Sequence, residues 1–119
     1  MDLVRSVLVV DDSRLSRMMI SKIVTSHHDN WLIVEAENAD MALELCQEQI
    51  FDYITLDHNM PGMTGLDAYP LIRAAQPNSK IGLFTANVQK STREKSEAIG
   101  LKFVEKPLSE DKVMLFFTE

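Results

Sequence analysis

The sequence predicts an α/β fold: a single domain with a doubly wound parallel sheet built from five βα units. Five short apolar runs of strand length alternate with longer segments whose apolar residues recur at helical spacing. The connections between these segments are short, so consecutive strands are joined by crossover helices and run parallel. The 119 residues suffice for one domain and leave no room for a second core.

The five apolar runs have the composition of strands that lie inside a sheet. Residues 6–10 form a near-continuous run of β-branched and apolar side chains, which is typical of a strand covered on both faces. The full set of predicted strands covers residues 6–10, 31–34, 51–56, 80–84 and 101–104. Strands of this kind predict helices on both faces of the sheet.

Helical signals follow each predicted strand. Apolar residues at helical spacing are found after the first and second strands, and residues 64–75 and 88–99 are the third and fourth predicted helices. Short polar side chains can cap a helix start by accepting bonds from its free N–H groups. Such residues follow the first, second and last strands: Asp12 or Ser13, Asn38 and Ser109.

Two residues set the expected end of one helix and the shape of another. Gly100 lies where a left-handed C-terminal cap would close the helix over 88–99. Pro70 falls inside the third helix, where it removes a donor and crowds the carbonyl of Leu66. We therefore expect this helix to kink or to start late, with Tyr69 leaning towards an extended conformation.

Composition excludes several classes of protein. The chain has 12 basic and 18 acidic residues and a net charge of −6, so a direct nucleic-acid-binding surface is not expected. The single cysteine, Cys46, cannot form an internal disulfide, which fits a reducing compartment. The apolar runs are too short to span a membrane, and the start of the chain does not resemble a signal peptide. We expect a soluble cytoplasmic domain without a membrane partner.

Chemically active side chains follow four of the five predicted strands. The carboxyl ends of parallel strands meet at one edge of a sheet, where such folds bind their ligands. Carboxylates that meet there repel one another until a cation or protons neutralise them, and oxygen donors without His or Cys favour Mg²⁺. These residues are Asp11, Asp12, Asp57, Thr85 and Lys106.

This set of residues resembles the receiver domain of two-component response regulators. Residues 57–65 read DHNMPGMTG, close to the D-x-x-M-P-x-M-x-G pattern common in that family, and Pro107 follows Lys106 as it does there. The resemblance extends from Val7 to about Phe117 and implies that residues 1–119 form one receiver domain. It also implies the flavodoxin-like strand order 2-1-3-4-5 and a cis peptide bond before Pro107.

The resemblance assigns a phosphoacceptor site to this edge of the sheet. Asp57 is implied to be the nucleophile that takes a phosphoryl group from a histidine kinase or a phosphotransfer protein. Asp12, Asp57 and the backbone carbonyl of Asn59 are implied Mg²⁺ ligands, with Asp11 acting through a water. Such a domain is not a conventional enzyme, because it catalyses only its own phosphotransfer and slow autodephosphorylation.

The resemblance also implies a switch. Lys106 and Thr85 are expected to bind phosphoryl oxygens, and Phe103, where many relatives carry tyrosine, is the aromatic residue expected to change its burial. The helix over 88–99 has few apolar residues and fits a movable element. Its face, together with the fifth strand and the last helix, is expected to control a downstream protein target or a fused output domain.

Three alternatives use a related fold or chemistry. A flavodoxin-type electron-transfer protein would need a phosphate-cradling loop after the first strand, where Asp11 and Asp12 would repel a phosphate. A phosphohydrolase of the haloacid dehalogenase type would need its nucleophile after the first strand, whereas Asp57 lies in mid-chain. A phosphorylation-independent docking module of the same fold would not need the five-residue set.

Overall fold

The computed structural model describes residues 3–86 and 89–118, and it confirms the α/β fold. Within these two ranges, five strands alternate with five helices. Among the described residues, no helix is both long and apolar enough to cross a membrane. The elements are β1 (Ser6–Val10), α1 (Arg14–His27), β2 (Leu32–Ala36), α2 (Ala39–Glu48), β3 (Tyr53–Leu56), α3 (Gly65–Ala75), β4 (Lys80–Thr85), α4 (Lys90–Ala98), β5 (Lys102–Glu105) and α5 (Glu110–Thr118).

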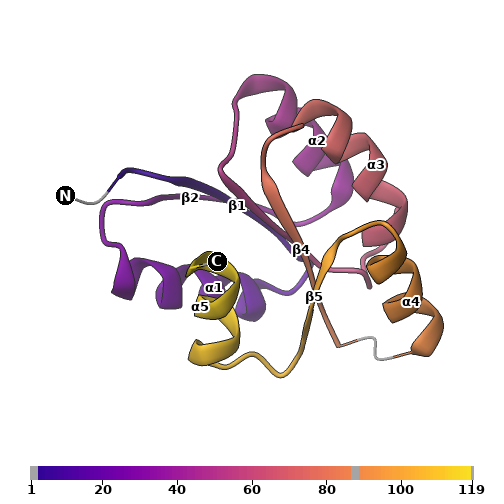
Figure 1. The fold of residues 1–119 in the computed structure, drawn as a ribbon. Coiled ribbons are helices and arrows are strands. Elements are labelled where there is room, and N and C mark those ends of the chain that lie inside the picture. Colours follow the sequence, from indigo (N-terminus) through magenta and orange to yellow (C-terminus); the bar gives the residue numbers. More distant parts are fainter. Residues whose placement is uncertain (1–2, 87–88, 119) are drawn as a thin grey trace.

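The sheet has the order β2-β1-β3-β4-β5, as the resemblance implies, and every neighbouring pair is parallel. Helices α1 and α5 cover one face, and α2, α3 and α4 cover the other (Figure 1). The chain adds β2 on one side of β1 and then adds β3, β4 and β5 on the other side, so the direction in which strands are added reverses at β1. The carboxyl ends of β1 and β3 therefore lie side by side, which is where ligands bind in such sheets.

The core lies in two layers, one on each face of the sheet. Val7 and Val9 of β1 pack with α1 and α5, whereas Leu8 and Val10 pack with α2 and α3. Side chains alternate between the two faces of a strand, so a strand covered on both faces must be apolar at every position. This accounts for the near-continuous apolar run in the sequence.

Polar caps start four of the helices beside the carboxyl ends of the strands. The side chains of Ser13, Asn38, Thr64 and Ser109 accept hydrogen bonds from the backbone N–H groups of the third residue after each cap. Each cap satisfies a donor that has no partner inside its helix. The caps therefore fix where these helices begin beside the site.

The prediction for the third helix is wrong in part. Helix α3 begins at Gly65, directly after its cap, and Tyr69 and Pro70 both lie within it, so it neither starts late nor extends at Tyr69. The proline is exposed, while Ala68 and Ile72 are fully buried beneath the helix. Burial of these apolar side chains holds the helical conformation despite the missing donor.

Helix α4 packs through hydroxyl groups. The buried residues of this helix, as far as the structure describes it, are Thr92 and Ser96, and the Ser96 hydroxyl donates to the carbonyl of Leu101. The predicted start at Val88 lies outside the described residues. Gly100 has a φ of 73°, which confirms the predicted left-handed cap. A helix that buries little apolar surface contributes little to stability and can move at low cost.

Substituting Gly65 with alanine should destabilise the protein, although alanine normally favours a helix. A Cβ at this position would lie 2.9 Å from the Cα of His58 and closer still to the carbonyl oxygen of Asp57. Since both contacts are backbone atoms, the loop must shift, and we expect a loss of about 2 kcal/mol in the free energy of unfolding.

Urea denaturation of Gly65→Ala checks this expectation, with the exposed, helical Ala74→Gly as the control. The control should lose about 1 kcal/mol through helix propensity alone. Equal or greater stability of Gly65→Ala than of the wild type would show that the close approach of α3 to the Asp57 backbone is not constraining.

Candidate phosphoacceptor site

The structure brings together the side chains that the sequence places at the strand ends. Asp11 and Asp12 follow β1, Asp57 follows β3, Thr85 ends β4, and Lys106 follows β5. Backbone hydrogen bonds between neighbouring strands hold the carboxyl ends of the strands in register. The N–H of Asp57 donates to Val10 at 2.9 Å, and the N–H of Lys106 donates to Thr85 at 2.9 Å.

Three carboxylates form the centre of the site. Oxygen atoms of Asp11, Asp12 and Asp57 all lie within 4.8 Å of one another. Asp11 and Asp57 are 1% and 4% exposed, while Asp12 is open to solvent. Closely held carboxylates repel one another, and a donor set made of oxygen atoms suits a hard divalent cation. The site is therefore an acidic pocket that fits such a cation.

Lys106 forms ion pairs with two of the three acids. Its ammonium Nζ lies 2.7 Å from Oδ2 of Asp11 and 3.8 Å from Oδ2 of Asp57. The peptide bond between Lys106 and Pro107 is cis, as the family resemblance implies. The ammonium is thus within reach of the space above Asp57 while its shorter contact is with Asp11.

The carboxyl of Asp57 sits in an environment that disfavours its charge. Burial is the main cause, and the charge of Asp11 adds to it, so that the pKa of Asp57 is raised to about 6. The ammonium of Lys106 opposes this rise, as do hydrogen bonds from the Thr85 side chain and the Asn59 backbone. A divalent cation would also favour the ionised carboxylate.

Asp11 is fixed by a residue that the sequence analysis did not single out. Its carboxylate accepts a hydrogen bond from the N–H of Ser13 at 2.9 Å, and its backbone carbonyl accepts one from Arg17 at 2.7 Å. Arg17 also forms an ion pair with Glu35 at 3.0 Å. Arg17 lies in the first turn of the helix that follows the acidic pair, a signal too common to have identified it from the sequence.

The start of α3 borders the site next to the phosphoacceptor candidate. Gly65 donates from its N–H to the carbonyl of His58 at 3.1 Å, and Nδ1 of His58 accepts from the N–H of Leu66 at 3.4 Å. Burial lowers the pKa of His58. The close contact that only Gly65 permits was also missed, since a glycine at a helix start has many possible roles.

The expected switch residues lie behind the acids. Thr85 is fully buried, and Phe103 is half-buried against the core layer of α2 and α3. The guanidinium of Arg93 on α4 lies 4.9 Å from the centre of the Phe103 ring and 3.5 Å from a carboxylate oxygen of Glu97. Phe103 therefore connects α4 with the strand that leads to Lys106.

A doubly wound domain with three acids, a lysine and a hydroxyl at this edge defines the class of aspartate-based phosphoacceptor domains. The comparisons identify the family: residues 7–117 match the response regulator receiver domain, and the chain belongs to this family. It is a signalling domain of two-component systems, and the three alternatives from the sequence are not favoured.

The matched relatives include several chemotaxis proteins. The chain is 36% identical over 108 residues to the chemotaxis protein CheY of Listeria monocytogenes, an alignment that covers 90% of both chains. It is 33% identical over 109 residues to CheY of Bacillus subtilis, covering 91% of this chain and 90% of the relative. These identities agree with the receiver fold.

Solved structures show the same architecture. CheY4 of Vibrio cholerae has a TM-score of 0.84 at 25% identity and aligns over 97% of both chains. The CheX–CheY–BeF₃–Mg²⁺ complex from Borrelia burgdorferi contains a chain with a TM-score of 0.81 at 25% identity, covering 95% of this chain and 86% of that one.

Proposed function

We propose that Asp57 is the residue that accepts the phosphoryl group, with a histidine kinase or a phosphotransfer protein as donor. The observation that carries this proposal is the position of the buried Asp57 carboxyl beside two further acids and 3.8 Å from the Lys106 ammonium. An oxygen of Asp57 would attack phosphorus in line, forming an O–P bond as the N–P bond to the donor imidazole breaks. The leaving imidazole takes a proton from solvent.

The residues of the acidic pocket fit Mg²⁺ as the resident cation. Asp12, Asp57 and the backbone carbonyl of Asn59 would hold it, with Asp11 acting through a water. Bound Mg²⁺ would neutralise charge on the transferring phosphoryl group. The close approach of the three carboxylates supports this fit, because their repulsion is relieved by a divalent charge.

Lys106 and Thr85 complete the proposed reaction site. The Lys106 ammonium would turn from Asp11 towards a phosphoryl oxygen, and the Thr85 hydroxyl would donate to another. Phosphotransfer leaves the protein mainly positioning and charge stabilisation to supply, and these two groups can supply both. Slow hydrolysis of the acyl phosphate by the domain itself belongs to the same proposal.

The proposed output is a change in the face formed by α4, β5 and α5. Movement of Thr85 towards the phosphoryl group would open space behind the site for Phe103, and Arg93 links that ring to α4. The scarce apolar burial under α4 keeps the cost of this movement low. The face would then control a downstream protein target or a fused output domain.

Incubation with Mg²⁺ and acetyl phosphate, followed by intact mass measurement, tests the proposed phosphoacceptor. We expect one phosphoryl adduct in the wild type, none in Asp57→Asn, and none when EDTA replaces Mg²⁺. Asp52→Asn is a matched control, because Asp52 precedes β3 at the opposite end of the strand. An adduct that persists in Asp57→Asn, or is absent from the wild type, would disprove the assignment.

A further inference from the structure

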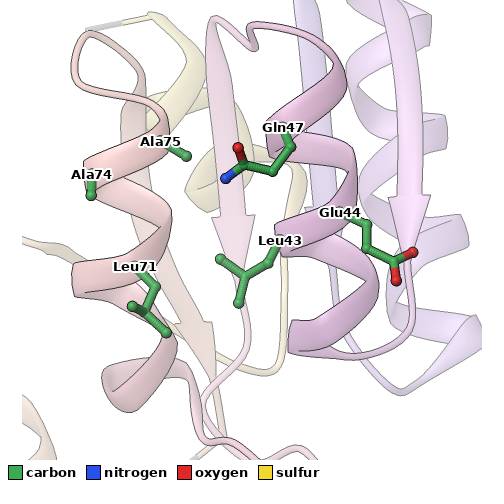
Figure 2. A pocket seen from close by; sticks show the side chains of 6 residues that line it. All are labelled: Leu43, Glu44, Gln47, Leu71, Ala74 and Ala75. Carbon is green, nitrogen blue, oxygen red and sulfur yellow. The ribbon is translucent and has the colours of Figure 1, made fainter.

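An apolar groove lies between α2 and α3, away from the face proposed for output. It encloses about 600 Å³ and is lined by Leu43, Glu44, Gln47, Leu71, Ala74 and Ala75. Figure 2 shows Leu43 and Gln47 extending from α2 towards α3, with Leu71 and Ala75 opposite them. Glu44 extends from the side of α2 that faces away from α3. Leu71 remains 50% exposed, so a large apolar side chain is left uncovered on the groove wall.

The exposed side of α2 beside this groove is acidic. Asp40, Glu44 and Glu48 are spaced four residues apart and therefore follow one another along the helix. Like charges at this spacing destabilise a helix, and Glu48 in the last turn also opposes the helix dipole. In the part of the chain that the structure describes, none of these three carboxylates forms an ion pair. Asp40, in the first turn, suits the helix dipole, whereas Glu44 and Glu48 are placed at a cost to the helix.

Basic side chains do not compensate this charge from the α3 side. Arg73, the arginine of α3, is half-buried and donates to the carbonyls of Gln76 and Ser79 and to the Tyr69 hydroxyl. Among the residues that the structure describes, those that line the groove include neither lysine nor arginine. A ligand with positive charge would therefore meet uncompensated acids along α2.

The acidic row of α2 begins beside the phosphoacceptor site. A second hollow, of about 500 Å³, is lined by Asp12, by Asp40 of α2, and by residues of the β2–α2 and β3–α3 connections that include Pro61 and Gly62. Asp40 belongs to the first turn of α2, so the acidic row begins at the rim of the site and runs down the helix.

We propose that the α2–α3 groove binds a basic amphipathic helix of a partner protein. Helix α2 has ten residues and is about 15 Å long, which matches about three turns of a partner helix. Apolar side chains of that helix would cover Leu43 and Leu71, and lysines or arginines beside them would pair with Asp40, Glu44 and Glu48. A second copy of this chain fits less well, since both copies carry a net charge of −6.

The probe for this proposal is a synthetic helical peptide of four turns with leucines on one face and lysines on the other. Backbone amide shifts of the ¹⁵N-labelled, unphosphorylated full chain report where it binds, so the result does not depend on phosphotransfer. We expect shifts concentrated on α2 and α3. A peptide with glutamates in place of the lysines should cause none.

Two pairs of variants separate the groove from general attraction. Leu71→Asp should abolish binding of the lysine peptide, whereas Leu115→Asp, at a residue 59% exposed on α5, should leave it unchanged. Asp40→Asn, Glu44→Gln and Glu48→Gln together should weaken binding roughly tenfold at low salt. A control with the same change in charge combines Asp29→Asn, Glu94→Gln and Asp111→Asn and should have a much smaller effect.

Several outcomes would overturn the proposal. Amide shifts that map mainly to other helices would show non-specific attraction of the peptide to an acidic protein. The same conclusion would follow if the two triple variants weakened peptide binding equally. Sedimentation of the free chain provides a further check. A dimer that becomes a monomer on Leu71→Asp would show that a second copy occupies the groove instead.

Discussion

Replacing Lys106 with methionine is expected to slow phosphoryl uptake from acetyl phosphate by about a hundredfold or more. The Lys106 ammonium is 2.7 Å from Asp11 and 3.8 Å from Asp57, and methionine keeps much of the side-chain length without the charge. Its loss removes the positive charge that can stabilise the negative charge developing on the phosphoryl group. It also removes an influence that lowers the pKa of Asp57, so less of that carboxyl is ionised.

Affinity for Mg²⁺ should respond in the opposite direction. The ammonium repels a divalent cation, so its removal should leave Mg²⁺ binding unchanged or tighter. The measurements are the rate of adduct formation by mass and a Mg²⁺ titration followed by isothermal calorimetry. Lys22→Met, on the exposed side of α1, is the matched control. Wild-type uptake in Lys106→Met would remove Lys106 from the proposed site.

The fold could be predicted from the sequence because its pattern is set by burial on both faces of the strands. Val7 to Val10 are all fully buried, so the periodicity, the length and the apolar character of this segment all predicted the same strand. The exception was Pro70, where a local rule for proline suggested a disturbed helix. Burial of Ala68 and Ile72 outweighs that rule, and such packing cannot be read from a local window.

The site residues could be predicted because parallel strands place their carboxyl ends at one edge. That rule located Asp57 and Lys106 without any knowledge of distances. It could not show that Lys106 makes its shorter contact with Asp11, because this depends on side-chain geometry across β1 and β5. The roles of Arg17 and Gly65 were missed for the same reason, since each depends on a backbone atom in another segment.

The packing of α4 shows a further limit of sequence patterns. Its few apolar residues predicted a weakly held helix, and the burial of Thr92 and Ser96 agrees with this. The sequence did not indicate that hydroxyls would form the contact. Ser96 can be buried because its hydroxyl reaches the carbonyl of Leu101, a partner outside the helix. The weak apolar contact of α4 is thus a property of the tertiary structure.

Substitution of Asp57 with asparagine is expected to stabilise the protein at pH 7 in the absence of a divalent cation. The pKa of Asp57 is raised from an ordinary value of 3.8 to about 6. The folded protein therefore binds this proton more tightly than the unfolded chain does. That contribution to stability is present below pH 4 and is lost as the pH rises through 6, by up to about 3 kcal/mol. Asparagine carries no charge and does not incur this loss.

Urea denaturation in EDTA at pH 7 and at pH 4 measures the expected difference. Asp57→Asn should be more stable than the wild type at pH 7, and the two should converge at pH 4, where the wild-type carboxyl is protonated. Added MgCl₂ should stabilise the wild type at pH 7 and have little effect on the variant, since a ligand stabilises only the state that binds it.

Asp52→Asn provides the control at the other end of β3. The Asp52 carboxylate accepts a hydrogen bond from the N–H of Ser6 at 2.8 Å and lies 3.6 Å from Arg5, so its loss should destabilise the protein. If Asp57→Asn raises the free energy of unfolding and Asp52→Asn lowers it, the Asp57 carboxylate is held at a cost to folding. A bound cation or a phosphoryl group can relieve this cost. If Asp57→Asn is no more stable than the wild type at pH 7, burial of the Asp57 charge and its repulsion by Asp11 cost too little to favour either event.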